Sequence, residues 1–503
     1  MPVDLSFPAH YGLVLLPEIV LSAWAMIVLM VDVFQKGSRS EPSSPSMPWI
    51  TLTGIALAAI ANAWIAGLSE TGAPGVIAVD SFRIFANYVF LLCAALFILI
   101  STRYIDEERL RLGELYVLIM FATLGMMVFA GARELMVMFI GLELMSLPIY
   151  VLTGINRRDR RSAEGALKYF LLGAFSSAFF LFGIALAYGG AGTTNLAGIA
   201  AAIGVDGIGA SPLLVVATAM LAVGFGFKIA AVPFHMWTPD AYEGAPTPVT
   251  AFMAAGVKAA AFAGFIRVFF TAFPGLYDTW DAIAIWLAVL TMVAANLIAL
   301  VQGNVKRMLA YSSIAHAGYL LVAVAAGSVL GAASFLFYAV SYTLMTMGAF
   351  AVVMVVSRYG EEGLDLEAYA GLAWRRPFLA TVLTIFLLSL AGFPFTGGFI
   401  GKVFIVRAAV EEGLVLLAVV LVMASLLSYF YYLRVAWYMW FREPVEGAAE
   451  SNGLATAMTV ALVITAVGTL LLGVVPGELL ALAERSAAGL MQVPLPLLGA
   501  GAP

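Results

Sequence analysis

Four lysines of this 503-residue chain lie inside apolar runs long enough to cross a membrane, namely Lys168, Lys228, Lys258 and Lys402. An ammonium in hydrocarbon is costly and is retained mainly where it acts on ions or protons. Arginine, which does not release its proton in proteins, is instead the main cation of the loops. This division between lysine and arginine indicates a chain that binds and releases protons within the bilayer.

Two interruptions of apolar runs lie beside these lysines. The segment from Lys228 to Lys258 reads KIAAVPFHMWTPDAYEGAPTPVTAFMAAGVK, and AGFPFTGGFIG immediately precedes Lys402. Proline lacks an N–H and clashes with the preceding helical turn, so Pro233 and Pro394 each predict a broken helix. We therefore expect Lys228 and Lys402 to lie within about two helical turns of a break.

Further ionisable residues lie in apolar surroundings. Glu143, near the centre of its run, is expected to take up a proton or to find a cation, as a static salt bridge or as a partner that tunes a lysine. His235 and His316 have no second histidine or carboxylate at i+3 or i+4, which favours a hydrogen-bonded relay over metal binding. Lys168 lies near a helix end, where a lysine can also snorkel.

Two other features have less specific interpretations. Asp240 and Glu243 follow the first interruption, where they fit either helix-capping residues or a proton entrance. The aromatic run SYFYYLRVAWYMWFR at 428–442 is typical of a membrane interface and predicts anchoring. Lys306 falls in an expected cytoplasmic loop and needs no further role.

The composition predicts an all-α polytopic membrane protein. The chain is 63% hydrophobic and 11% charged, with a mean hydropathy of +1.01. A membrane helix needs about 20 apolar residues, and a lone strand cannot satisfy its backbone in lipid. We predict about 14 transmembrane helices, at 11–34, 48–68, 78–101, 112–130, 134–154, 163–188, 211–243, 247–272, 282–303, 305–327, 331–357, 376–410, 414–440 and 454–476.

The loop charges and the two breaks predict the topology. Lysine and arginine concentrate in alternate loops, which marks the cytoplasmic side and puts both termini outside. The broken helices are the seventh and twelfth, which points to two inverted five-helix repeats, helices 4–8 and 9–13, with the ion site at the breaks. The expected domains are an N-terminal flank (1–111), a first repeat (112–272), a second repeat (282–440) and a C-terminal helix and tail (454–503).

Some classes of protein are disfavoured by absent motifs. The single cysteine, Cys93, excludes a disulfide framework and a cysteine-ligated iron–sulfur site within this chain. GxxxxGK[ST], CxxC and HExxH do not occur, and the N-terminus has no basic region typical of a cleaved signal peptide.

Several motifs resemble one known family. PFHMWTPDAYEGAPTPVTAF, LELMSLPIYVLTG, ALKYFLLGAFSSAFFLFGIALAYG, VKRMLAYSSIAHAGY and GFPFTGGFIGK are similar to the antiporter-like membrane subunits of respiratory complex I, NADH:quinone oxidoreductase. YEGAPTP and Lys402 resemble the subunit N (subunit 2) branch. The short C-terminal segment differs from the long lateral helix expected of subunit L.

This resemblance implies roles for the residues above. Glu143 would modulate the pKa of Lys228, Lys258 would be the central relay lysine, and Lys402 the terminal one. Lys168, His235 and His316 would support the relay. The chain would be one proton-translocating subunit of a translocase in a bacterial inner membrane, bound by lipid and by subunit K-like and M-like neighbours, without nucleic acid.

The resemblance also implies where the redox chemistry lies. NADH, FMN, iron–sulfur clusters and quinone would be bound by partner subunits, and this chain would hold no cofactor or metal. The alternative is a subunit of a multisubunit Na⁺(K⁺)/H⁺ antiporter. A purely structural scaffold is hard to reconcile with four intramembrane lysines.

Overall fold

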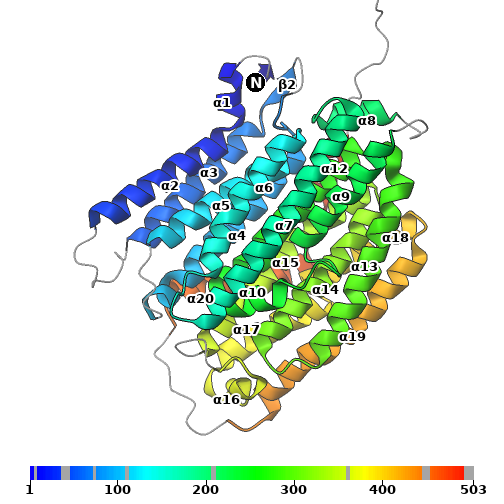
Figure 1. Cartoon of the computed structure of the whole chain (residues 1–503). Helices are drawn as coiled ribbons and strands as arrows, with labels where there is room; N and C mark the ends of the chain where they lie inside the picture. The colour runs from blue at the N-terminus through cyan, green and yellow to red at the C-terminus, as the bar shows by residue number, and fades with distance from the viewer. Residues whose placement is uncertain are drawn as a thin grey trace, which may run out of the picture.

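The computed structural model describes residues 1–4, 8–35, 46–71, 75–107, 113–204, 211–357, 363–444 and 454–491. Its long helices run side by side in one bundle (Figure 1). The elements are β1 (Pro2–Asp4), α1 (Pro8–Val14), α2 (Leu16–Gln35), α3 (Met47–Ile65), β2 (Ser69–Thr71), α4 (Ser81–Glu107), α5 (Gly113–Gly131), α6 (Leu135–Thr153), α7 (Arg160–Ala191), α8 (Leu196–Ile203), α9 (Pro212–Lys228), α10 (Thr238–Gly244), α11 (Thr247–Phe252), η1 (Met253–Val257), α12 (Lys258–Ala272), η2 (Pro274–Leu276), α13 (Tyr277–Leu300), α14 (Val305–Ala325), α15 (Val329–Val356), η3 (Leu366–Tyr369), α16 (Leu372–Arg375), α17 (Pro377–Ala391), α18 (Gly397–Glu411), α19 (Val415–Phe441), α20 (Thr456–Val474) and α21 (Gly477–Met491).

The helices confirm an all-α membrane fold. Twelve helices among the described residues are long and apolar enough to cross a membrane, and they occupy twelve of the fourteen expected positions. The other two expected positions hold pairs of shorter helices, α9 with α10 and α17 with α18. The predicted breaks at Pro233 and Pro394 therefore occur between the members of these two pairs.

The helices around Lys258 and His316 form the centre of the bundle. Two spans are buried throughout their most apolar stretch. One is 247–272, which contains α11, η1 and α12, and the other is 305–325, which is α14. Around them, α15 packs against α4, α18, α20 and α21. A polar residue on α12 or α14 therefore faces other helices rather than lipid, so it needs protein or water partners.

Glycines let the neighbouring helices α5 and α6 approach closely. A Cβ on Gly125 of α5 would lie 2.2 Å from the backbone nitrogen of Met145 on α6. A Cβ on Gly141 of α6 would lie 2.6 Å from the backbone nitrogen of Phe129 on α5. Small residues at membrane helix contacts permit such backbone-to-backbone packing. This contact fixes α6, which carries Glu143, against the rest of the bundle.

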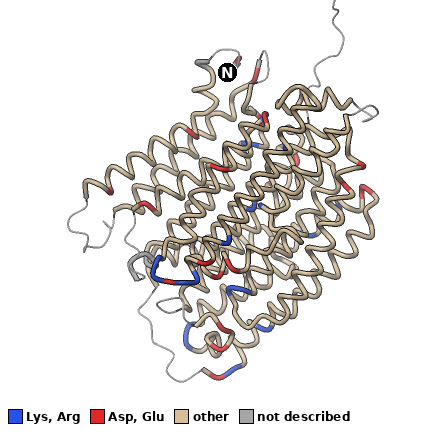
Figure 2. Tube along the Cα trace, in the orientation of Figure 1, with Lys and Arg blue, Asp and Glu red and all other residues tan. Residues whose placement is uncertain are grey.

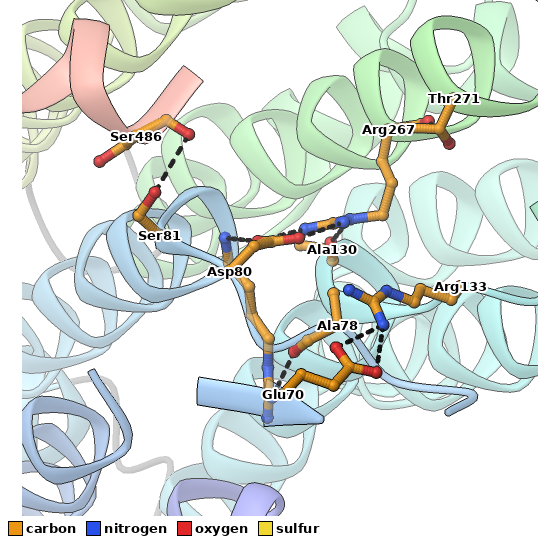
Figure 3. Close-up of polar contacts among 10 residues, drawn as sticks. Glu70, Ala78, Asp80, Ser81, Ala130, Arg133, Arg267, Thr271 and Ser486 are labelled. Atoms are coloured by element: carbon orange, nitrogen blue, oxygen red, sulfur yellow. Dashed lines mark hydrogen bonds and ion pairs between the residues drawn. The ribbon is translucent and has the colours of Figure 1, made fainter. Parts of the chain in front are cut away.

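A buried ion pair joins the start of α4 to α12, and a second ion pair lies near it (Figure 3). Arg267 of α12 donates through both terminal nitrogens to Asp80, at 2.8 and 2.9 Å, and through Nε to the carbonyl of Ala130 at 2.5 Å. Nearby, Arg133 pairs with Glu70 at 2.6 Å. Asp80 and Arg267 are both buried, so this pair is shielded from solvent and ties α12 to the start of α4.

Two elements differ from the sequence-based expectations. The first expected span, 11–34, is divided into α1 and α2 near Leu15. After α20 the chain continues into α21, which packs against α4 and α15 and was expected only as part of the C-terminal tail. The strands β1 and β2 form a small parallel pair with Pro2 opposite Ser69.

Candidate functional site

Lys228 is the last residue of α9, directly before the first break. Its Nζ donates to Ser146 Oγ at 2.7 Å and to the hydroxyl of Tyr150 at 3.1 Å, both on α6. The side chain is only 3% exposed. A cation at a helix C-terminus is stabilised by the free carbonyls and the helix dipole. Lys228 is thus held by neutral groups and a helix end, without a carboxylate partner among the described residues.

The first break is irregular but ordered by side chains. Between Ile229 and Trp237 the backbone is not helical, and Ala230 has a positive φ of 62°. The backbone N–H of Val232 donates to Thr291 Oγ1 at 2.9 Å. The indole of Trp237 donates to the carbonyl of Phe227 at 3.1 Å. Protein side chains therefore replace several of the helical hydrogen bonds lost at membrane depth.

Glu143 lies one helical turn before Ser146 on α6. Its Oε1 accepts a hydrogen bond from Ser177 of α7 at 2.5 Å. Within the described residues no ion pair joins Glu143 to a lysine. Glu143 and Ser146, which binds Lys228, lie on successive turns of α6. The sequence could not say which lysine contacts Glu143, and the described residues show no direct contact with any of them.

Lys258 lies where a π-helical turn meets α12. The turn η1 spans Met253–Val257, and single π turns inside α-helices are frequent at functional sites. The Nζ of Lys258 donates to both the carbonyl and the Oγ of Ser313 on α14, each at 2.5 Å. Lys258 is 2% exposed, so a serine of a neighbouring helix is its polar environment.

Lys402 lies on the first turns of α18, after the second break. Its Nζ donates to the carbonyls of Leu390 and Ala391, at 2.8 and 2.9 Å, and to Ser425 Oγ at 2.7 Å. The two carbonyls end α17, so the lysine satisfies acceptors that the break leaves free. Gly392 follows with a φ of 91°, and a Cβ there would lie 3.1 Å from the lysine side chain.

His316 is 1% exposed and lies on α14, three residues after Ser313, which binds Lys258. The ring of Tyr319 lies 5.1 Å from the imidazole and 4.9 Å from the Nζ of Lys402. Both ring nitrogens have tyrosine partners: Nδ1 lies 2.5 Å from the hydroxyl of Tyr338, and Nε2 lies 3.2 Å from that of Tyr432. The structure thus brings Lys258, His316 and Lys402 into one region of the core.

Lys168 and His235 are placed differently. Lys168 is 43% exposed and pairs with Glu164 and Asp240, each at 2.7 Å. His235 is partly exposed within the first break. Neither residue forms a hydrogen bond or an ion pair with Lys228, Lys258 or Lys402 in the described part of the chain. The structure therefore separates these two supporting residues from the three buried lysines.

Asp240 and Glu243 belong to an ion-pair cluster at the end of the bundle that carries α10. Arg307 of α14 donates to Asp240 at 3.1 Å and to Glu243 at 2.5 Å. Trp237 occupies the N-cap position of α10, so capping by Asp240 or Glu243 is not the role these carboxylates take. They instead connect α10 to its neighbours α7 and α14.

Two expectations from the sequence differ from the structure. Lys306 is not a solvated loop residue: it is fully buried on α14 and donates to the carbonyl of Ala245 at 2.6 Å. In the run 428–442, Tyr431 and Tyr432 are buried, whereas Trp437 is 55% exposed. Only the later part of the run therefore suits membrane anchoring.

The hydroxyl groups that bind the lysines and the histidine were not predicted from the sequence. These residues are Ser146, Tyr150, Ser313, Tyr338, Ser425 and Tyr432. The neighbouring serines in YSSIAHAGY were the available signal, because hydroxyls next to a buried histidine predict a hydrogen-bonded chain. No group of three or more potential metal-ligating residues occurs in the described part of the chain.

Buried lysines beside interrupted helices define a class of membrane proteins that move ions or protons. Comparison with known proteins identifies the family. The family model for the transmembrane region of NADH:quinone oxidoreductase and Mrp antiporters matches residues 132–428. The chain therefore belongs to the NADH:quinone oxidoreductase/Mrp antiporter family of membrane subunits.

Relatives and solved structures cover nearly the whole chain. NADH-quinone oxidoreductase subunit N of Trichlorobacter lovleyi is 46% identical over 473 residues, covering 94% of this chain and 96% of the relative. A chain of respiratory complex I from Thermus thermophilus is similar with a TM-score of 0.78 and 36% identity, covering 93% of this chain and 99% of that one. A chain of the Mrp complex from Dietzia shares the fold, with a TM-score of 0.81, 21% identity and coverage of 97% and 99%.

Proposed function

We propose that this chain is a proton-translocating membrane subunit of an NADH:quinone oxidoreductase. The observation that carries the proposal is the environment of Lys228, Lys258 and Lys402. Each is buried, and each is bound by hydroxyl or carbonyl groups rather than by a carboxylate among the described residues. A static ion pair would hold a lysine charged, whereas neutral partners allow it to lose and regain a proton.

The roles of the individual residues follow from their contacts. Lys228 receives and releases protons at the first break, with Glu143 one turn away on α6 to stabilise its charged form. Lys258 is the central carrier on α12, and Lys402 is the terminal carrier at the second break. His316 lies on the route between the last two. We infer that Lys168 and His235 lie at the periphery of this route.

The relatives and the complex I structure support a multisubunit enzyme around this chain. We infer that partner subunits bind NADH, FMN, iron–sulfur clusters and quinone, and that this chain contributes no redox centre to the translocase. Subunit K-like and M-like membrane neighbours would cover its sides. Redox energy would reach the chain as an electrostatic or conformational change, which shifts the proton affinity of Lys228.

The distribution of charge supports an orientation in the membrane. Figure 2 shows Lys and Arg gathered toward the end of the bundle away from the N-terminus. Cytoplasmic loops carry the excess of basic residues. We infer a bacterial inner membrane, with both termini on the outer side. We also propose the two inverted repeats, 112–272 and 282–440, each interrupted once, flanked by 1–111 and 454–503.

The test is NADH-driven proton uptake in liposomes that contain the purified complex. Acidification should accompany NADH oxidation by quinone, should be abolished by an uncoupler, and should not require Na⁺. Co-purification of the chain with flavin-containing and iron–sulfur subunits is the matching biochemical result. Purification in a complex without redox subunits, together with Na⁺-dependent exchange, would instead support the antiporter alternative.

A further inference from the structure

Resting on the proposed function, we propose that Tyr432 and Tyr338 are proton-transferring groups on the two sides of His316. The proposal rests on one observation: two buried phenol hydroxyls contact the imidazole of His316. Tyr338 is 0% exposed and Tyr432 is 1% exposed, and they come from different helices, α15 and α19. Their hydroxyls meet opposite nitrogens of the same ring.

The Tyr432 side of the ring leads toward Lys258. Its hydroxyl also hydrogen-bonds Ser312 Oγ of α14. The next residue, Ser313, binds the ammonium of Lys258 through its carbonyl and its Oγ. Ser313 thus contacts the lysine, and the adjacent Ser312 contacts the tyrosine. The hydroxyls of Ser313, Ser312 and Tyr432 therefore lie along the way from Lys258 to Nε2 of His316. No hydrogen bond joins the two serine hydroxyls in the described part of the chain, so a water must bridge them.

The Tyr338 side of the ring leads toward Lys402. Gly401 and Lys402 are adjacent on α18, and a Cβ on Gly401 would lie 2.4 Å from Cδ2 of Tyr338. The absence of that Cβ lets the tyrosine ring rest directly on α18 beside the lysine. The structure shows no direct hydrogen bond between Tyr338 and Lys402, so the last transfer needs water.

A neutral imidazole donates from one nitrogen and accepts at the other. With Nδ1 protonated, His316 donates to Tyr338 and accepts from Tyr432. A proton that leaves Lys258 passes through Ser313, a bridging water and Ser312 to the oxygen of Tyr432. The hydrogen that Tyr432 held before then forms the new N–H bond at Nε2. The Nδ1 hydrogen passes to the Tyr338 oxygen, and the Tyr338 hydrogen passes through water to the neutral amine of Lys402.

The proton transfers described above balance. One ammonium loses a proton, one amine gains it, and the imidazole ends in its other tautomer with the same number of protons. Rotation of the hydroxyls and return of the tautomer restore the starting state. A phenylalanine at position 432 or 338 keeps the ring and its packing but removes the hydroxyl that the transfer requires.

The experiment measures proton pumping by the assembled complex in liposomes with Tyr432→Phe, Tyr338→Phe and the double variant. Tyr369→Phe is the matched control, because Tyr369 is fully buried and its hydroxyl has no hydrogen-bond partner. We expect each single variant to pump at least about tenfold more slowly, as loss of a proton-transfer group does. The double variant should be little worse than either single variant, since either one breaks the same chain.

His316→Gln provides a second variant that does not depend on the tyrosines. Glutamine can donate and accept hydrogen bonds but cannot exchange tautomers, so the complex should assemble and pump at least about tenfold more slowly. Normal pumping by His316→Gln, or by both phenylalanine variants, would overturn the inference. Lys258→Ala distinguishes failure of the proposed function from failure of the tyrosine route. If the Lys258→Ala complex pumps normally, the proposed function fails. If it does not pump while the tyrosine variants do, only the tyrosine route is rejected.

Discussion

The ammonium of Lys402 donates across the second break to the carbonyl of Ala391, at 2.9 Å. Lys228 likewise lies at a break, but as the last residue of the helix that precedes it. In both cases a buried cation meets a helix C-terminus, where free carbonyls and the helix dipole favour positive charge. Break carbonyls bind Lys402, whereas the Nζ of Lys228 meets the hydroxyls of Ser146 and Tyr150 on α6. Neither lysine has a carboxylate partner among the described residues, which supports the proposal that their protons exchange.

Lys402→Arg should impair pumping nearly as much as Lys402→Ala. The guanidinium keeps the positive charge but does not release its proton. Proton uptake by liposomes containing each variant measures this directly, with subunit content checked on the purified complex. Recovery of pumping by arginine would mean that Lys402 serves as a static cap of α17.

Glu143→Gln should lower pumping while the complex still assembles. Glutamine can keep the hydrogen bond with Ser177, but it removes the negative charge one turn from the site that binds Lys228. The charged form of Lys228 then loses its electrostatic support. The quinone-reductase rate and proton uptake are the readouts. Wild-type values for both in a fully assembled complex would exclude this role for the carboxylate.

Gly401→Ala should reduce pumping through its effect on Tyr338. The new Cβ would lie 2.4 Å from the tyrosine ring, so the ring or α18 must shift. Gly303→Ala is the matched control, because nothing lies within 4 Å of a Cβ there. A shift of even 1 Å disturbs a hydrogen-bonded transfer. Equal pumping by the two alanine variants would show that the packing of Tyr338 on Gly401 is not needed.

Asp80→Asn should destabilise the subunit by about 3–5 kcal/mol, because it leaves the buried Arg267 guanidinium without its anion. Replacing both residues, with Asp80→Asn and Arg267→Gln, should cost less than the single change. The thermal midpoint of the purified complex measures both effects. A double variant that is as unstable as the sum of its single variants would show that the two residues act independently.

The same pair predicts a pH dependence. Burial alone would raise the pKa of Asp80, but Arg267, aided by the backbone N–H of Arg83, outweighs it and holds the pKa below its usual value. A lowered pKa in the folded state gives stability that is present above the unfolded pKa and is lost as pH falls through the folded one. Asp80→Asn should therefore flatten the acid side of the stability profile. An unchanged profile would contradict this linkage.

The sequence predicted the membrane class and the breaks because both depend on local properties. Apolar length fixes a membrane helix, and Pro233 and Pro394 interrupt hydrogen bonding wherever they lie. The buried lysines were equally visible, because a cation within an apolar run is exceptional. These features need no knowledge of which helices become neighbours.

The partners of the lysines could not be predicted in the same way. Ser313, Tyr338 and Tyr432 reach Lys258 and His316 only because α12, α14, α15 and α19 meet in the core. Tyr432 lies in a run whose later residues do face outward, so its composition alone pointed to the membrane interface. Lys306 looked like a loop cation because its partner, the carbonyl of Ala245, is far away in sequence.

The central claim is that protons cross this chain through its buried lysines, and the most direct test is the number of protons pumped per NADH oxidised in Lys258→Met. Arg407→Gln is the control, since Arg407 is an exposed cation paired with Glu411. The account predicts that Arg407→Gln keeps the wild-type ratio, whereas Lys258→Met either pumps fewer protons per NADH or slows electron transfer with pumping. An assembled Lys258→Met complex with the wild-type rate and the wild-type ratio would contradict it.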